Sequence, residues 1–298
     1  MSFSSGVKAE LCRQSMTGKS CAVAQCYGVL LYCNTFSADC IRIITESREF
    51  AELLPRLFRK AFGVEFDALP EAETPGKLQF ELTGRESIRK IYQSFGFSAS
   101  DNVTLHVNYA ILEDEPERLA FFRGAFLAGG SVTDPTKRYH LELATPHLQA
   151  SKEMLALLMD MGFAPKQTLR TGTSVLYFKQ SDSIEDFLTA IGAPVAAMGV
   201  MEAKVEKELR NGVNRRVNCE TANLDKAVDA SMEQVAAIRR LQERGDWETL
   251  SPKLRQTAEL RLENPEATLT ELAELLDPPL TKSAVNHRLR KLMELAGE

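Results

Sequence analysis

The chain has 298 residues, of which 44% are hydrophobic, and its 36 basic and 41 acidic residues give a formal net charge of −5. This length allows one large domain or two to three smaller ones with real cores, and the acidic balance argues against a chain that is basic throughout. Nucleic-acid binding stays possible, because it depends on the electrostatic field at one face rather than on the net charge.

The N-terminal segment MSFSSGVKAELCRQS is polar and lacks the apolar core of a signal peptide. The longest apolar stretches, CAVAQCYGVLLYC and APVAAMGVM, are too short and too interrupted to span a bilayer. We therefore expect a soluble, cytoplasmic protein without a membrane partner.

The cysteines form no C-x-x-C pair, which argues against a zinc site. In a cytoplasmic protein they are expected to stay reduced and to serve as small packing residues. The six residues are Cys12, Cys21, Cys26, Cys33, Cys40 and Cys219.

The first two hundred residues contain an internal repeat. Segments 87–96 (SIRKIYQSFG) and 183–192 (SIEDFLTAIG) lie 96 residues apart, and each follows an alternating, strand-like run. Upstream, segments 45–63 and 145–162 predict two further matching helices. Each repeat is therefore predicted as helix, strand pair, helix, strand pair, helix, which is an α+β fold with pseudo-twofold symmetry.

The first helix of each repeat pattern is apolar and carries a glycine. The two predicted helices are residues 21–33 and 119–130, and their glycines, Gly28 and Gly124, are again 96 residues apart. Glycine has no Cβ, so it lets two helix backbones approach closely. The simplest interpretation is a buried pair of crossing helices.

After about Pro194 the composition changes. Residues 201–223 are highly charged, with apolar residues at helical spacing, and predict a connecting helix plus a loop. From Leu224 the pattern is helical, with Ser251-Pro252 as a clear helix start. The predicted domains are residues 1–200, made of two repeats (about 1–100 and 101–200), a connector at 201–222, and a C-terminal all-α domain at 223–298.

Residues 269–296 have the pattern of a helix-turn-helix, with Asp277–Leu280 as the connector. Apolar residues at helical spacing predict the buried face of each helix. In the first helix these are Leu269, Leu272, Ala273 and Leu276, and in the second they are Val285, Leu289, Leu292 and Ala296.

The second of these helices is basic although the chain as a whole is acidic, because Thr281–Met293 contains four Lys or Arg residues and no acid. Arg and Lys bind phosphates and guanine edges, and Asn pairs with adenine, so we predict a helix that enters the major groove of double-stranded DNA. The competing interpretation is an ordinary helical hairpin with a solvated basic face. The predicted DNA-binding residues are Thr281 as the helix cap, Ser283, Asn286, His287 and Arg290 on the outer face, and Lys282, Arg288 and Lys291 at its margins.

Residues 122–131, FRGAFLAGGS, resemble the LAGLIDADG motif of homing endonucleases. In that family two such helices pack together along the pseudo-twofold axis, and an acid at the end of each holds a divalent metal ion beside the scissile phosphates. Alignment on Gly124 and Gly28 puts these acid positions at Gly129 and Cys33, and neither side chain suits magnesium. The resemblance therefore implies a nuclease frame without catalytic residues or a metal.

Two acids lie downstream of these positions. They are Asp39 and Asp134, and the sequence Thr-Asp-Pro around Asp134 favours a turn.

The whole chain resembles the WhiA family, in which a LAGLIDADG-like domain is joined to a C-terminal helix-turn-helix. The segments that carry the resemblance are SFSSGVKAEL, RGAFLAGGSV with YHLELAT, NRRVNCETANLDKAV and TKSAVNHRLRKL. It implies a bacterial, nucleoid-associated regulator of transcription that binds specific DNA sequences, with no enzymatic activity and no cofactor. The processes it implies are cell division, chromosome segregation and, in sporulating relatives, sporulation.

Two points stay open at the level of sequence. Arg215 and Arg216 would either contact phosphate or, as we favour, tie the connector to one of the domains. The rival functions are an active endonuclease or maturase with displaced acids, and a scaffold whose repeat domain recruits another regulatory protein while the C-terminal domain holds DNA.

Overall fold

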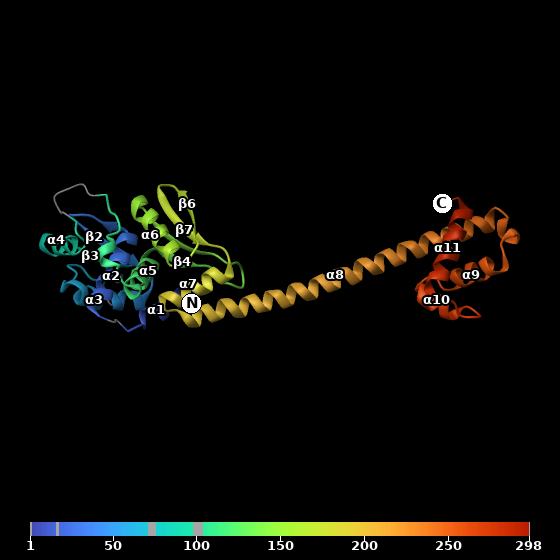
Figure 1. The fold of residues 1–298 in the computed structure, drawn as a ribbon, viewed down its shortest axis with the longest axis horizontal. Coiled ribbons are helices and arrows are strands. Elements are labelled where there is room, and N and C mark those ends of the chain that lie inside the picture. Colours follow the sequence, from blue (N-terminus) through green and yellow to red (C-terminus); the bar gives the residue numbers. More distant parts are fainter. Residues whose placement is uncertain (1, 16–17, 71–75, 98–103, 298) are drawn as a thin grey trace. The chain divides into compact units, whose positions relative to one another are not determined.

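The computed structural model describes residues 2–15, 18–70, 76–97 and 104–297. Its contacts divide the chain into two compact units, with the boundary between Glu208 and Leu209. Each unit has a hydrophobic core of its own. Figure 1 labels the elements that have room for a label.

The first repeat forms a three-stranded antiparallel sheet, in the order β1-β2-β3, covered by helices. Its elements are α1 (Phe3–Cys12), α2 (Lys19–Tyr32), β1 (Thr35–Phe36), β2 (Ile41–Thr45), α3 (Arg48–Phe62), β3 (Leu78–Leu82) and α4 (Arg85–Ser94). The predicted second strand pair is incomplete, because Ala68 meets Glu81 only in an isolated bridge. Pro70, two residues after Ala68, has no N–H to donate to a ladder, which limits strand pairing in the described residues up to that point.

The second repeat has a four-stranded antiparallel sheet, in the order β4-β5-β7-β6. Its elements are the 3₁₀ turn η1 (Tyr109–Ile111), α5 (Glu115–Gly129), β4 (Gly130–Val132), β5 (Leu141–Thr145), α6 (Leu148–Asp160), β6 (Lys166–Arg170), β7 (Thr173–Phe178) and α7 (Ser181–Ile191). Here the predicted order of helix, strand pair, helix, strand pair and helix is confirmed.

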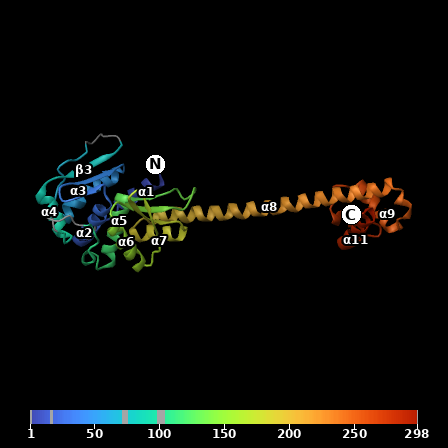
Figure 2. The ribbon, with the colours of Figure 1, turned by 90° about the horizontal axis from the view of Figure 1, so that it is seen from above.

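Helices α2 and α5 lie side by side at the centre of the first unit (Figure 2). Both are apolar on nearly all sides, as a helix buried within a core must be. Aromatic rings surround the pair: Tyr27 of α2 stacks on Phe95 with 4.1 Å between ring centroids and contacts Phe121 of α5. One continuous apolar core therefore joins the two repeats.

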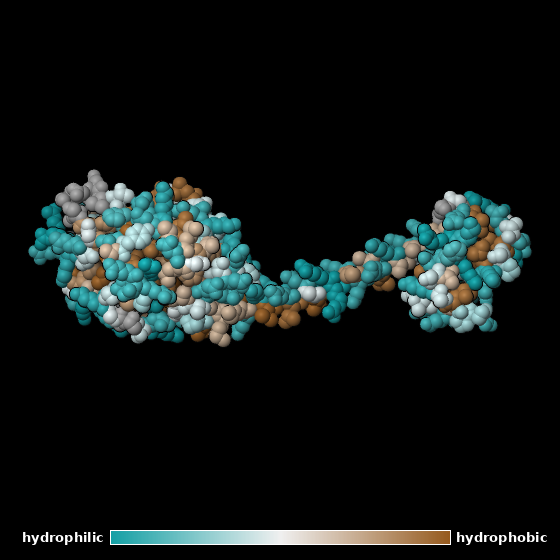
Figure 3. Space-filling view, in the orientation of Figure 1, coloured by the Kyte–Doolittle hydropathy of each residue, from teal (hydrophilic) through white to brown (hydrophobic). Residues whose placement is uncertain are grey.

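The connector was predicted as a helix followed by a loop, and the loop is wrong. The structure has one continuous helix here, α8 (Pro194–Glu243). After Pro194 it contains no proline, and the isolated Gly199 and Gly212 weaken a helix without ending it. Figure 3 shows apolar side chains exposed along α8 between hydrophilic ones. Cys219 lies exposed on this helix, so the expectation that every cysteine is a packing residue is wrong there.

The second unit continues with η2 (Asp246–Thr249), α9 (Pro252–Glu263), α10 (Leu269–Leu275) and α11 (Lys282–Ala296). The predicted apolar faces of the last two helices are confirmed: the stripe of α11 is buried against Leu272, Ala273 and Leu276. Ser251 stands at the N-cap of α9 and Pro252 in its first turn, also as predicted. Among the described residues, no helix is both long enough and apolar enough to cross a membrane.

Candidate nucleic-acid interface and the glycine helices

The crossing of α2 and α5 depends on the two glycines. A Cβ added at Gly28 would lie 2.0 Å from the carbonyl oxygen of Phe121, and one at Gly124 would lie 1.9 Å from that of Gln25. Real Cβ atoms never come so close to backbone, so the helices meet main chain against main chain. The prediction of close approach at both glycines is confirmed.

The end of α5 has no room for a side chain at residue 129. A Cβ added at Gly129 would lie 2.4 Å from the carbonyl oxygen of Ala144 and 3.0 Å from the ring of Tyr32. Thr145 donates a 2.6 Å hydrogen bond to the Leu31 carbonyl and closes the same region. A carboxylate at residue 129 would therefore collide with the neighbouring strand.

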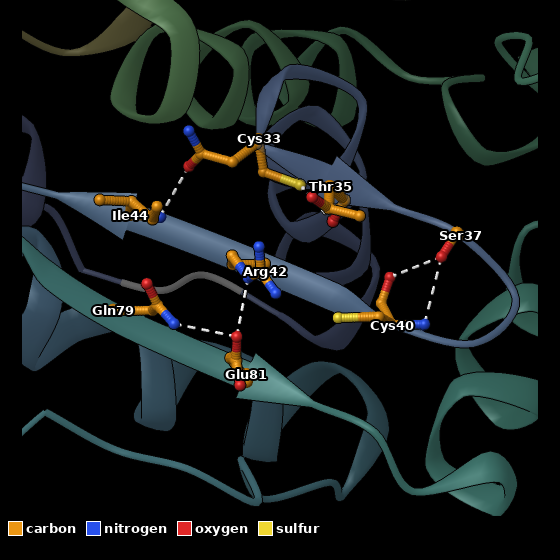
Figure 4. A network of polar contacts seen from close by, with 9 residues as sticks. Cys33, Thr35, Ser37, Cys40, Arg42, Ile44, Gln79 and Glu81 are labelled. Carbon is orange, nitrogen blue, oxygen red and sulfur yellow. Dashed lines mark hydrogen bonds and ion pairs between the residues drawn. The ribbon is translucent and has the colours of Figure 1, made fainter.

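Cys33 occupies the equivalent position of the first repeat (Figure 4). Its thiol is buried and donates to the carbonyls of Leu30 and Thr35, both at 3.2 Å. Burial raises the pKa of the Cys33 thiol to about 12, so it stays neutral. A neutral, soft thiol and a glycine do not fit a hard divalent cation.

Two acids of the first unit, Glu81 and Asp134, are already bound by protein groups. On the first sheet, Glu81 accepts from Arg42 at 2.7 Å and from Gln79 at 2.9 Å (Figure 4). The Asp134 carboxylate accepts from the backbone N–H and the hydroxyl of Thr136, and these bonds lower the pKa of Asp134. The turn predicted at Asp134 is therefore confirmed.

Asp39, the other downstream acid, lies in the turn between β1 and β2. Within the described ranges, no group of three or more His, Cys, Asp or Glu side chains is placed to hold a metal ion.

In the second unit, Thr281 caps α11 by accepting from the N–H of Ala284 at 3.3 Å. The helix turns its apolar stripe inward and its polar side outward. Thr281, Lys282, Ser283, His287, Arg290 and Lys291 are exposed, and Asn286 and Arg288 are partly exposed. The structure thus gathers all the predicted residues of α11 on or beside one accessible surface, which we call the α11 face.

Two margin residues of the α11 face have partners within the protein. Arg288 donates to the hydroxyl of Thr257 at 3.2 Å and to the carbonyl of Lys253 at 3.4 Å, and so ties α11 to α9. Lys291 forms an exposed ion pair with Glu294 at 3.0 Å. Sequence patterns did not reveal the contact of Arg288, because its partner is 31 residues away in the chain.

Arg261 is a structural residue that the sequence analysis missed. Its side chain is only 2% exposed and donates to the carbonyl of Ala267 at 2.7 Å, in the loop that leads into α10. Burial lowers the pKa of Arg261, but a guanidinium stays charged at neutral pH. It holds the loop before the two helices of the helix-turn-helix.

Arg215 and Arg216 lie exposed on α8. In the part of the chain that the structure describes, neither guanidinium has a hydrogen-bond or ion-pair partner. The structure therefore provides no bond for the favoured role of tying the connector to a domain.

The geometry agrees with comparisons to known proteins. The model of the WhiA C-terminal HTH domain matches residues 213–296, and that of the WhiA LAGLIDADG-like domain matches residues 118–210. The "Probable cell division protein WhiA" of Ruminiclostridium cellulolyticum is 38% identical, over 99% of this chain and 97% of the relative. The protein of the same name from Clostridium novyi is 34% identical, over 100% and 98%.

Solved structures support the same fold class. The crystal structure of full-length DUF199/WhiA from Thermatoga maritima aligns with a TM-score of 0.61 at 23% identity, over 99% of this chain and 98% of that one. The N-terminal LAGLIDADG domain of DUF199/WhiA aligns with a TM-score of 0.51 at 21% identity, over 64% of this chain and 92% of that one. The predicted fold, a LAGLIDADG-like domain with a C-terminal helix-turn-helix, is confirmed.

Proposed function

Because the chain belongs to the WhiA family, we propose that it is a regulatory protein that binds specific DNA sequences through α11 and has no catalytic activity. The observation that carries this proposal is the α11 face: a capped helix whose outer residues are basic or polar, with no acid from Thr281 to Met293. Such a helix suits the major groove, where bases show distinct donor and acceptor patterns.

The cellular role follows from the relatives, which are named probable cell division proteins. We extend that role to transcription of genes for division and chromosome segregation, and for sporulation where the host sporulates. The protein would act in the cytoplasm, at the nucleoid. The proposed domains remain residues 1–200, the connector 201–222 and the DNA-binding domain 223–298.

The experiment compares two kinds of residue on the α11 face. Asn286→Ala or Arg290→Ala should narrow the difference in affinity between target and scrambled duplexes by roughly 1–3 kcal/mol, because a base contact is lost. Lys282→Ala, which removes a margin charge, should weaken both duplexes together and reduce the salt dependence. Binding of the full chain is measured across a salt series.

An unchanged preference in both Asn286→Ala and Arg290→Ala would move sequence recognition away from α11. The next candidates would be Arg215 and Arg216, whose exposed guanidinium groups suit contacts with phosphate.

The rival function is DNA cleavage by displaced acids. We expect no cleavage of a plasmid that carries the target site, with magnesium or manganese, because Gly129 and Cys33 supply no carboxylate and their surroundings are filled. Specific cleavage that disappears in Asp39→Ala or Asp134→Ala would establish the rival instead.

A protein partner is a second candidate for the first unit. Residues 1–208 contain 22 basic and 26 acidic residues, a net charge of −4, and an acidic domain suits a protein partner better than a DNA backbone. The test uses the full chain with Lys282→Ala, Arg290→Ala and Lys291→Ala combined. Loss of all DNA affinity leaves the first unit free for such a partner, whereas substantial remaining affinity would place DNA on it.

A further inference from the structure

The part of α8 that begins the second unit is exposed to solvent on all sides. Every residue from Leu209 to Asp229 is exposed, and burial begins only near Ser231, where the helix joins the core of the second unit. A helical segment of this length usually owes its stability to tertiary packing of one face.

This segment is also a poor helix former by composition. It includes Gly212 and the asparagines Asn211, Asn214, Asn218 and Asn223, all of which have low helix propensity. The helix therefore needs stabilising contacts that the second unit, taken by itself, does not provide.

Large apolar residues line one side of the segment, which we call the α8 stripe. At 100° per residue they fall within an arc of roughly 140°, comparable to the apolar face of a packed helix. Each side chain is between 49% and 67% exposed, and the members are Leu209, Val213, Val217, Leu224, Val228 and Met232. Apolar colour is visible on this part of the helix in Figure 3.

The charges around the stripe divide into two opposite halves. Residues 209–219 carry three arginines and no acid, a charge of +3, whereas residues 220–235 carry four acids and one lysine, a charge of −3. Two parallel copies would place like charges together. Two antiparallel copies place each basic half against the partner's acidic half, which is the favourable arrangement.

We propose that two copies of the chain pair antiparallel through the α8 stripe, with the two-fold axis between Asn218 and Cys219. This register sets Leu209 opposite Val228 and Val213 opposite Leu224, so these four apolar members cover one another, and Met232 comes opposite the exposed Val205. Val217 comes opposite Glu220 near the axis. A two-fold interface needs such self-complementarity.

The same register places Arg216 beside Glu220 of the second copy. Both side chains are exposed in the single chain, and Arg216 lies at the edge of the stripe. A single helix pair forms a small interface, so the dimer is expected to depend on protein concentration and on salt. Each dimer would carry two α11 faces. When one face has bound a DNA molecule, the effective concentration of that DNA at the second face would be raised.

The first test is disulfide crosslinking in a Cys219→Ser background. The double variant Val213→Cys/Leu224→Cys should form a covalent dimer on mild oxidation, because the two positions face each other between copies. Within one helix they are roughly 16 Å apart, too far for a disulfide. The Cys219→Ser parent, treated identically, is the control and should stay monomeric on a non-reducing gel.

The single variant Val213→Cys decides the direction of the helices. Antiparallel pairing separates the two copies of residue 213 by roughly 16 Å, so little covalent dimer is expected, whereas parallel pairing would crosslink them. Efficient crosslinking of the single variant, or none of the double variant, would overturn the proposal.

The second test measures the dimer dissociation constant by analytical ultracentrifugation of the full chain without DNA. Arg216→Glu should raise it roughly 2- to 30-fold, since two symmetry-related exposed ion pairs are lost, and adding Glu220→Arg should restore it. Arg215→Glu is the matched control: it makes the same charge change on the opposite side of the helix.

If Arg215→Glu and Arg216→Glu raised the dimer dissociation constant equally, the proposed register would be wrong. If the parent chain stayed monomeric at all concentrations, the proposed dimer would be wrong. Neither measurement contains DNA, so failure here leaves the proposed function of α11 standing.

Discussion

The crossing of α2 and α5 and the outer surface of α11 differ in the space that surrounds their residues. At the crossing, Gly28, Gly124 and Gly129 leave no space for a single added carbon. On α11 the residues opposite the buried stripe keep long polar side chains exposed to solvent. The central helix pair of the LAGLIDADG-like domain is thus tightly packed, whereas the face that we propose for DNA is exposed to solvent. The two regions should therefore respond differently to substitution.

The largest effect is expected at the crossing. Gly124→Leu should cost more than about 3 kcal/mol of the first unit's stability, because its Cβ alone would overlap the Gln25 carbonyl and the backbone has no room to move. Thermal unfolding of the full chain would show loss of the first unit's transition.

DNA affinity through α11 should survive in Gly124→Leu. Gly6→Ala is the matched control: Gly6 lies in α1 with nothing within 4 Å of the added carbon, and it should gain roughly 0.5–1 kcal/mol. A Gly124→Leu protein that melts like the parent would disprove the backbone contact.

The next effect concerns the core beneath the α11 face. Leu289 is fully buried, so Leu289→Ala should cost about 2–5 kcal/mol and lower only the transition of the second unit. Leu295→Ala, in the same helix but 45% exposed, should cost much less. Equal losses in differential scanning calorimetry would contradict the assignment of the inner and outer sides of α11.

A smaller effect separates a positioning residue from a DNA contact. Arg288→Ala should destabilise the second unit by roughly 1–2 kcal/mol, because a charged hydrogen bond to Thr257 is lost, and Thr257→Val should reproduce part of that loss. Urea unfolding measures both variants.

If Arg288 instead acts as a phosphate contact, Arg288→Ala would leave stability unchanged. It would then reduce the salt dependence of DNA binding by about one phosphate charge.

The smallest effect concerns the start of α10. Thr268 and Glu271 form a reciprocal cap, with the Glu271 carboxylate accepting from the Thr268 N–H at 2.7 Å. Thr268→Ala should cost about 1 kcal/mol in chemical denaturation. The same bonds lower the pKa of Glu271, so their contribution is complete above the unfolded pKa and is lost as pH falls through the lowered folded pKa.

The pH dependence can be tested with Glu271→Gln, which keeps the shape of the side chain and removes its titration. The second unit of this variant should lose less stability on acidification below about pH 4.5 than the parent does. Identical acid profiles for the parent and the variant would show that Glu271 does not contribute.

Much of the second unit followed from the sequence alone. The apolar stripe of α11, the cap at Thr281 and the helix start at Ser251-Pro252 depend on neighbours within one or two turns, and such local patterns are present in the order of residues. In the first unit, the repeated order of predicted elements indicated the α+β class. The two glycines at matching positions indicated the close helix pair.

The tertiary structure decided what distant residues do to one another. Arg288 has a margin position in the helical pattern, and only the structure shows that it donates a hydrogen bond to Thr257 on α9. The sequence shows that Gly129 has no side chain to bind a metal ion. Only the structure shows that a side chain at this position would collide with the carbonyl of Ala144. Helical periodicity fixes which side of a helix is apolar, whereas the groups that meet that side come from other segments, and their distances are set only when the whole chain packs.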